Sequence, residues 1–241
     1  MSRRWANVAA ALTLVAAAAG PHKVVRNAGG LEFSYVWPTE AVAIPALDLR
    51  LYTDAKTNLA KAQKYASDDK KLAVSQKRDF DGHYYSMMWS TAGQSARLLS
   101  LEGNFEAFTG GAHPQHGSDA LLWDRRLNRP IDISALFLKN SSFAAITRSS
   151  YCKALDTERR QKREGEKLGG DFDACPKYSE LKIAPFDNNG NGRFDRIHFV
   201  ADEYVAGPYV EGAYETPLPV TAQLIAALKP EYRSSFEAYR Q

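Results

Sequence analysis

Hydrophobic and polar positions change their period along the first third of the chain, and the change predicts two different elements. Residues 31–37 alternate between large apolar side chains and smaller or polar ones, which predicts a half-buried strand that Pro38 ends. From Pro45 to about Val74 the apolar residues recur at helical spacing, with Lys and Asp between them. That spacing predicts one long amphipathic helix.

Further strand-like and helical runs follow along the chain. We expect antiparallel strands at 84–91 and 96–101 around Gly93, and then strands at 120–124, 130–133, 180–186, 194–201 and 213–218. A second helix begins after Ser141 or Ser142, and a third covers 221–228. This order predicts an α+β fold, with a mixed, mainly antiparallel sheet, a long N-terminal helix and a second packed helix.

Composition narrows the class of protein. The chain has 241 residues, of which 44% are hydrophobic and 24% charged, as expected for a folded globular protein. A mean hydropathy of -0.41 excludes a protein with many membrane spans. The net charge of +3 includes Arg3 and Arg4 and becomes +1 without them, which is too small for a nucleic-acid-binding protein.

The first 20 residues are typical of a secretory signal peptide. Arg3 and Arg4 precede an apolar, Ala-rich run from Val8 to Ala19. A run of about 12 apolar residues is shorter than the roughly 20 needed to span a bilayer. The alternative, an N-terminal helix of the mature protein, would normally have a polar face. We therefore expect a periplasmic or secreted protein with no membrane span after signal cleavage.

Export changes how the two cysteines are interpreted. In an oxidising compartment Cys152 and Cys175 can form a disulfide around the 22 residues between them. The enclosed segment is charged from Arg159 to Lys167 and can bury little apolar surface, so a covalent link is useful there. We predict one intramolecular disulfide.

Residues 110–119 contain the densest polar group, with three Gly, two His and an Asp. His113, His116 and Asp119 could bind zinc and support metal-assisted hydrolysis. The helical His-Glu-x-x-His arrangement is absent, however. Gly110 and Gly111 more simply mark a bulge or a close backbone approach after a strand.

A second candidate site lies at 187–195, where four side chains follow the first half of a calcium loop: Asp187, Asn189, Asn191 and Asp195. The twelfth position is His198, so the bidentate Glu is missing. Asn-Gly pairs between two strand-like runs are also a strong hairpin-turn signal. We favour the hairpin and keep calcium as the alternative.

Tyrosines alternate with Gly and Pro in residues 204–219, as Tyr204, Tyr209 and Tyr214. Such a stiff aromatic loop suits partner binding, although the same tyrosines could close the edge of a core. The sequence has no Gly-x-Ser-x-Gly segment for nucleophilic catalysis. Asp202 and Glu203 would point to opposite faces of a strand, which does not support acid–base chemistry.

Three segments together resemble a bacterial envelope module of unknown function: Phe-Thr-Gly-Gly-Ala-His at 108–113, Trp123-Asp124 with 130–137, and 204–209 through Gly212 and Pro219. The module occurs in the ectodomain of the RsiV anti-sigma factor and beside the catalytic module of PdaC-type peptidoglycan deacetylases. The resemblance covers roughly residues 100 to 236. It implies an extracytoplasmic α+β fold and, as in RsiV, lysozyme binding.

This resemblance also suggests a division of the chain. We expect a signal peptide at 1–20, a small α+β companion domain at 21–95 and the RsiV-like domain at 96–241. The sigma-binding segment with its stop-transfer helix and the deacetylase module are not found in the sequence, so we expect a free-standing exported module.

The function expected from the sequence is a non-enzymatic binding module of the cell envelope. Its partner would be an envelope protein, with lysozyme as one candidate, or peptidoglycan. The competing function is a metal-assisted hydrolase acting on an envelope substrate. The residues expected to bind the partner lie in two loops: His113, His116, Tyr204, Tyr209 and Tyr214. No cofactor is expected, with calcium as the one alternative.

Overall fold

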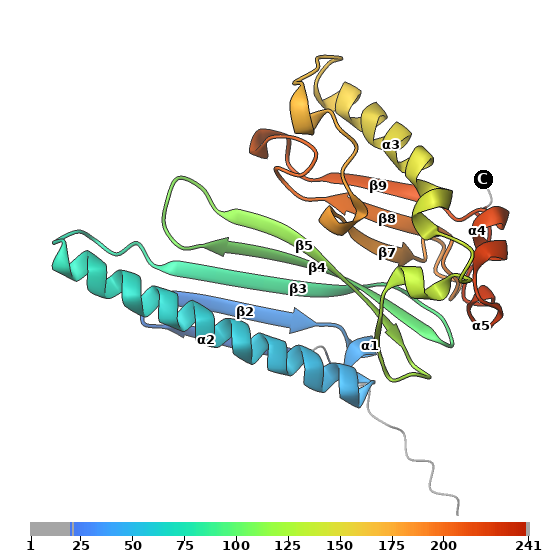
Figure 1. Cartoon of the computed structure of the whole chain (residues 1–241). Helices are drawn as coiled ribbons and strands as arrows, with labels where there is room; N and C mark the ends of the chain where they lie inside the picture. The colour runs from blue at the N-terminus through green and yellow to red at the C-terminus, as the bar shows by residue number, and fades with distance from the viewer. Residues whose placement is uncertain (1–19, 21, 240–241) are drawn as a thin grey trace, which may run out of the picture.

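The computed structural model of the chain describes residues 20 and 22–239, which form two β-sheets and two main helices (Figure 1). The predicted signal peptide lies outside the described residues except for Gly20. The first sheet has six strands in chain order: β1 (His22–Ala28), β2 (Leu31–Trp37), β3 (His83–Gln94), β4 (Leu98–Phe108), β5 (Gln115–Asp124) and β6 (Arg129–Ile131). The second sheet has three: β7 (Lys182–Phe186), β8 (Arg196–Ala201) and β9 (Tyr214–Pro219).

All neighbouring strands are antiparallel except β2 and β3, which are parallel. Two helices connect this parallel pair: the short α1 (Thr39–Val42) and the long α2 (Pro45–Ser75). A parallel pair needs such a crossover because the chain must return to the same end of the sheet. The predicted α+β fold with a mainly antiparallel sheet is therefore confirmed.

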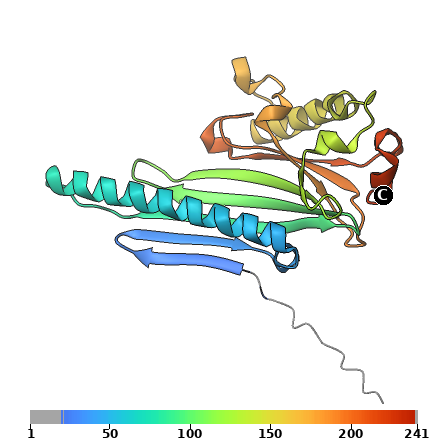
Figure 2. The ribbon, with the colours of Figure 1, turned by 60° about the horizontal axis from the view of Figure 1, so that its bottom comes forward.

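Helix α2 lies along one face of the first sheet (Figure 2). The residues that it buries follow the predicted helical spacing: Leu47, Leu51, Ala55, Leu59, Ala66 and Ala73. Buried aromatic side chains of the sheet also hydrogen-bond to its polar residues. The Tyr35 hydroxyl donates to Asp54 at 2.6 Å, and Trp37 Nε1 donates to Asp48 at 2.7 Å. These bonds give the hydroxyl of Tyr35 and the indole N–H of Trp37 a partner, without which their burial would cost free energy.

The second sheet packs on helix α3 (Phe143–Lys162), the second packed helix of the prediction. Ser142 caps the helix by accepting a hydrogen bond from Ala145 N at 3.2 Å, which confirms one of the two predicted start positions. Short helical segments complete this part: η1 (Ile133–Leu136), η2 (Gly170–Phe172), η3 (Tyr178–Glu180), η4 (Tyr209–Glu211), α4 (Ala222–Ala227) and α5 (Pro230–Arg233).

Strands β4 and β5 contribute to two hydrophobic cores, one on each face. Leu99 and Trp123 belong to the core under α2, whereas Leu98 and Leu122 belong to the core of the second sheet and α3. This follows from the two-residue period of strands. The predicted domain boundary after residue 95 falls in the turn that joins β3 to β4, and the division into domains stays a prediction.

Gly93 marks a close contact between the two sheets and not the predicted turn between strands. It lies in a bulge of β3, and a Cβ there would be 2.7 Å from the Cβ of Asp187. The Asp187 N–H donates to the Ala92 carbonyl at 3.0 Å. Only glycine leaves room for this approach.

The predicted disulfide between Cys152 and Cys175 is confirmed, with an S–S distance of 2.01 Å. It fastens α3 to the segment that leads into β7. The bond fits a protein that matures in an oxidising compartment. Among residues 20 and 22–239, no helix is long and apolar enough to cross a membrane.

Candidate functional site

The two loops of the predicted binding site, far apart in sequence, meet over one end of β4 and β5. The rings of His113 and Tyr209 lie 4.0 Å apart between centroids, with 30° between their planes. The Tyr209 hydroxyl donates to the Pro114 carbonyl at 3.2 Å. His116 and Tyr204 each lie 6.1 Å from the Tyr209 ring. We call His113, His116, Tyr204 and Tyr209 the His–Tyr surface.

The position of Tyr209 is fixed by ion pairs behind its loop. Glu211, in the same 3₁₀ turn, accepts from Arg163 Nε and Nη2, both at 2.9 Å. Arg163 also pairs with Asp173 at 2.7 Å, and its side chain is only 4% exposed. Lys162 Nζ donates to the carbonyls of Glu211 and Ala213. Helix α3 therefore holds the Tyr209 loop against the second sheet.

Tyr214 does not belong to the binding surface, which corrects its predicted role. Its side chain is fully buried in the second core, and its hydroxyl donates to Glu211 at 2.5 Å. Burial and then this hydrogen bond raise the pKa of Tyr214 to about 12. The alternative, that a tyrosine of this segment closes the edge of a core, is correct for Tyr214.

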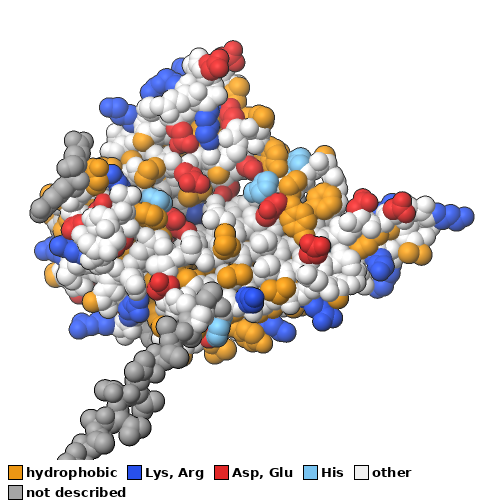
Figure 3. Space-filling view, turned by 180° about the vertical axis from the view of Figure 1, so that it is seen from behind, with side chains coloured by type: hydrophobic (Ala, Val, Ile, Leu, Met, Phe, Trp, Pro, Cys, Tyr) orange, Lys and Arg blue, Asp and Glu red, His pale blue; other side chains and the backbone are white. Residues whose placement is uncertain are grey.

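A cleft of about 330 Å³ adjoins the His–Tyr surface, between β4 and β5 on one side and the segments around β9 on the other. Four carboxyl groups and one imidazole line it: Glu106, Asp202, Glu203, Glu215 and His116. Of the described residues in its lining, none is Lys or Arg. We call this the acidic cleft. Figure 3 shows acidic and His side chains beside hydrophobic ones on this face of the molecule.

His116 connects the cleft to the His–Tyr surface. Its Nδ1 lies 3.2 Å from Glu203 Oε1, and its Nε2 lies 3.8 Å from Glu106 Oε1. Glu106 also accepts a 2.5 Å hydrogen bond from Tyr84, which raises the pKa of that hydroxyl to about 12. Partial burial and then the carboxylate of Glu203 raise the pKa of Tyr209. Both tyrosines therefore stay protonated and can donate hydrogen bonds at neutral pH.

Sequence reasoning missed the carboxylates of the cleft. Asp202 and Glu203 were placed on a strand, where adjacent side chains point to opposite faces. β8 ends at Ala201, however, so both residues lie in the following turn and line the same cleft. An acidic pair directly before an aromatic loop is the signal that could have suggested this.

The three candidate zinc ligands are not brought together. His116 and Asp119 are three positions apart on β5 and so lie on opposite sides of the strand. Asp119 Oδ1 lies 4.0 Å from Lys182 Nζ, and His113 Nδ1 is 2.9 Å from the Pro114 carbonyl oxygen. Among the described residues, no three His, Cys, Asp or Glu side chains form a group that could hold a metal ion.

Residues 187–195 form the turn of the β7–β8 hairpin, as the favoured interpretation predicted. Asp187 organises the turn: its Oδ1 accepts from Gly190 N and Asn191 N, and its Oδ2 from Gly192 N. His198, at the twelfth position, lies on β8 and stacks on Phe186, with ring centroids 4.0 Å apart.

Glu237 lies close to this turn, although no sequence signal pointed to it. Its Oε1 accepts from the side-chain amides of Asn189 and Asn191, both at 2.7 Å. Asp195 is buried and its Oδ1 accepts from Asn188 N. These hydrogen bonds explain how the turn is held, and calcium binding at Asp187, Asn189, Asn191 and Asp195 stays a prediction.

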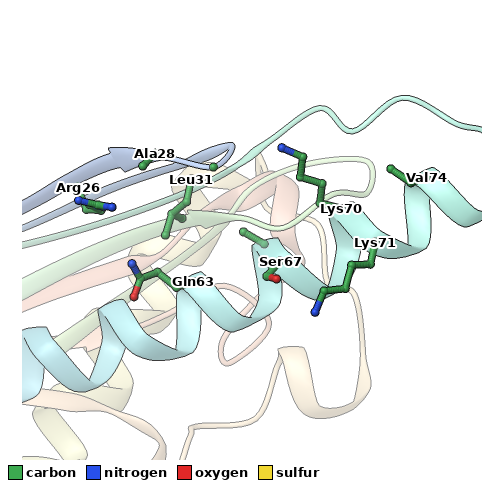
Figure 4. A pocket seen from close by; sticks show the side chains of 10 residues that line it. Arg26, Ala28, Leu31, Gln63, Ser67, Lys70, Lys71 and Val74 are labelled. Carbon is green, nitrogen blue, oxygen red and sulfur yellow. The ribbon is translucent and has the colours of Figure 1, made fainter.

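A larger groove of about 760 Å³ lies on the other face of the first sheet, between the β1–β2 turn and the C-terminal half of α2 (Figure 4). Its basic residues are Arg26, Lys70 and Lys71. Ala66 and Leu31 form part of its apolar wall. None of the candidate site residues predicted from the sequence lines this groove.

Comparisons with known proteins show a shared fold. No family model matches the chain, and no curated protein matches it in sequence. Two crystal structures of DUF3298 family proteins are similar to it. One is from Pseudomonas aeruginosa PAO1, with a TM-score of 0.55 and 15% sequence identity. The matched region covers 91% of this chain and 97% of the Pseudomonas chain.

The other is from Bacteroides fragilis NCTC 9343, with a TM-score of 0.52 and 14% sequence identity. The matched region covers 89% of this chain and 94% of the Bacteroides chain. Identities this low establish the fold and not the activity. The chain therefore has the fold of DUF3298 family proteins, a bacterial domain of unknown function.

Proposed function

We propose that this protein is an exported, non-enzymatic binding module that recognises a protein of the cell envelope, in the periplasm or outside the cell. The observation that carries the proposal is the close contact between the tilted rings of His113 and Tyr209, which joins the two predicted binding loops. Lysozyme is the first candidate partner, because the resemblance to the RsiV ectodomain includes residues 204–209, which contain Tyr204 and Tyr209. Peptidoglycan is the alternative ligand.

The chemistry of the surface supports binding. Tyr204 is 60% exposed and Val210 is 88% exposed, while Met88 is 58% exposed beside the acidic cleft. Exposed aromatic and methionine side chains are enriched in protein interfaces, where tyrosines contribute a large contact area at low entropic cost. The surrounding carboxylates can form a polar rim. This combination is typical of a protein-binding surface.

Affinity capture from envelope extract, together with a panel of purified lysozymes and a peptidoglycan sedimentation assay, tests this function. The bait is the mature protein, with Tyr209→Ala and His113→Ala as variants. Tyr65→Ala is a matched control, because Tyr65 is 59% exposed on α2, away from the site. We expect the two site variants to lose capture and the control to retain it. Unchanged capture by both site variants would contradict the proposal. If the protein binds sedimented peptidoglycan and captures no protein, then peptidoglycan is the ligand and the proposed protein partner is wrong.

A further inference from the structure

We propose that strand β1 and the basic groove beside it bind an extended acidic segment of a partner protein, which adds a seventh strand to the first sheet. This surface lies on the side of the sheet that faces α2, away from the acidic cleft, so the inference goes beyond the proposed function. β1 is the edge strand of the sheet and pairs only with β2. An open edge is a template for another strand, and strand addition is a common mode of peptide recognition.

The backbone of β1 offers three residues to an added strand. Residues 29–30, both glycines with positive φ, connect β1 to β2 in a two-residue turn, and the residues that flank such a turn form a hydrogen-bonded pair. Counted from that pair, the N–H and C=O groups of Lys23, Val25 and Asn27 point away from β2. In the described part of the chain, none of these three residues forms a backbone–backbone hydrogen bond outside the sheet.

The basic groove lies where alternate side chains of an added strand would point. Val24, Arg26 and Ala28 pair with buried residues of β2 and therefore face helix α2. The helix does not cover this part of β1: Arg26 and Ala28 are exposed and line a groove of about 760 Å³, in which Leu31 and Ala66 are the buried lining residues. A strand about 4.8 Å from β1 would place every second side chain in this groove.

The charge of the groove selects an acidic segment. Arg26 comes from the sheet, and Lys70 and Lys71 come from α2 (Figure 4). Of the described residues in the lining, none is Asp or Glu. Lys71 Nζ lies 3.7 Å from Asp68 Oδ1, whereas Arg26 and Lys70 have no ion-pair partner among the residues that the structure describes. The carboxylates of a bound segment would supply such partners.

The charge of β1 itself disfavours a second copy of this chain as the occupant. The strand contains His22, Lys23 and Arg26 and no Asp or Glu, so two such strands would repel each other. Charged side chains of this kind prevent a sheet edge from pairing with its own copy. They leave the edge open to a strand of opposite charge.

The probe for this inference is the peptide acetyl-Thr-Glu-Val-Glu-Val-Glu-Thr-amide. Its control has both Val replaced by Pro, which keeps the charge and removes two backbone N–H groups. Binding to the mature protein is followed by ¹H–¹⁵N NMR titration, and strand pairing by amide hydrogen exchange. We expect the probe to slow exchange at Lys23, Val25 and Asn27, which charge attraction alone would not do. The Pro peptide should bind about tenfold more weakly or less, because it cannot complete the backbone pairing.

Substitutions separate the backbone edge from the charges. Val25→Pro removes an outward N–H and should abolish binding, whereas Val25→Thr keeps the N–H and should bind as wild type does. Lys70→Gln should raise the dissociation constant of the probe by about threefold. Lys56→Gln removes an exposed lysine of α2 outside the groove and should leave the constant unchanged. Circular dichroism checks the folding of each variant, and the lysine pair tests the groove even if Val25→Pro is unfolded.

Four results would overturn the inference: no saturable binding of the probe, equal binding of the two peptides, unchanged exchange at the three amides under saturation, or a dimer of the mature protein in which the same amides are protected. Sedimentation equilibrium detects the dimer, which would make a second copy the occupant. Tyr209→Ala should leave the dissociation constant of the probe unchanged, so this surface and the proposed function can fail separately.

Discussion

Arg163 is the residue on which the candidate site depends most, although it does not lie on the His–Tyr surface. Its side chain is 4% exposed and donates hydrogen bonds to two carboxylates and two backbone carbonyls. A buried guanidinium is tolerated only when its donors are satisfied. Two of the Arg163 donors bind Glu211, and this ion pair connects the end of helix α3 to the turn that contains Tyr209.

Glu211→Gln should lower the free energy of unfolding by about 3 kcal/mol at neutral pH, because it removes a charge partner from buried Arg163. Chemical denaturation followed by circular dichroism measures this. Glu166→Gln is the control, since Glu166 is exposed. Equal destabilisation by both variants would show that the Glu211 pair contributes nothing specific.

The same pair predicts a pH dependence. Burial alone would raise the pKa of Glu211, but the hydrogen bonds from Arg163 and Tyr214 outweigh it and leave the pKa below its usual value. A lowered pKa contributes stability above the unfolded value of about 4.3, and this contribution is lost as pH falls through the folded value. Wild-type stability should therefore decline below about pH 4.5, and Glu211→Gln should decline less over the same range.

At the scale of elements, the disulfide supports a region with little apolar surface of its own. Residues 163–174, between α3 and Cys175, are mostly exposed and contain only one short 3₁₀ turn. Replacing both Cys152 and Cys175 by Ala should lower the free energy of unfolding by about 3 kcal/mol, mainly by freeing the unfolded chain. Thermal unfolding of the variant, and of wild type with and without reductant, measures this. A variant as stable as oxidised wild type would contradict it.

The β7–β8 turn gives a second prediction for an element. Asp187→Ala removes the acceptor for three backbone N–H groups and should cost about 1 kcal/mol in buffer with chelator. Calcium at about 5 mM exceeds the dissociation constants of extracellular calcium modules. A rise in melting temperature on adding calcium, absent in Asp187→Ala, would support the predicted calcium loop. No change would leave a hairpin turn alone.

Elements with a strong local period could be predicted from the sequence, and those set by distant contacts could not. The pattern of 31–37 and the spacing from Pro45 identified β2 and α2 almost to the residue. β1 was missed because it is an edge strand whose side chains are mostly exposed, so its sequence lacks the alternation of apolar and polar residues that identifies a half-buried strand. β4 was predicted too short, because Gly103 and Asn104 interrupt its apolar run.

The same limit applies to the site. The sequence singled out His113, His116 and Tyr209 by residue type, and the fold brings these three together. It could not distinguish exposed Tyr204 from buried Tyr214, because both occur in one Gly- and Pro-rich segment. The acidic cleft needs β4, β5 and the turn after β8 to meet, which is a property of the tertiary structure.

At the scale of the whole molecule, the first sheet separates two hollows that are lined by charges of opposite sign. Helix α2 and the basic groove lie on one face, and the second sheet and the acidic cleft lie on the other. Fold similarity to DUF3298 family proteins extends over about nine tenths of the chain. A partner that approaches the acidic cleft would be selected by positive charge as well as by aromatic contact.

The dissociation constant of the captured partner, measured by surface plasmon resonance with wild type, Tyr209→Ala and Tyr65→Ala, tests the central claim most directly. We predict that Tyr209→Ala raises the constant about 30-fold or more, as expected for an aromatic hot spot, while Tyr65→Ala changes it by less than about twofold. Equal constants for all three proteins would show that the partner binds elsewhere and would contradict the account.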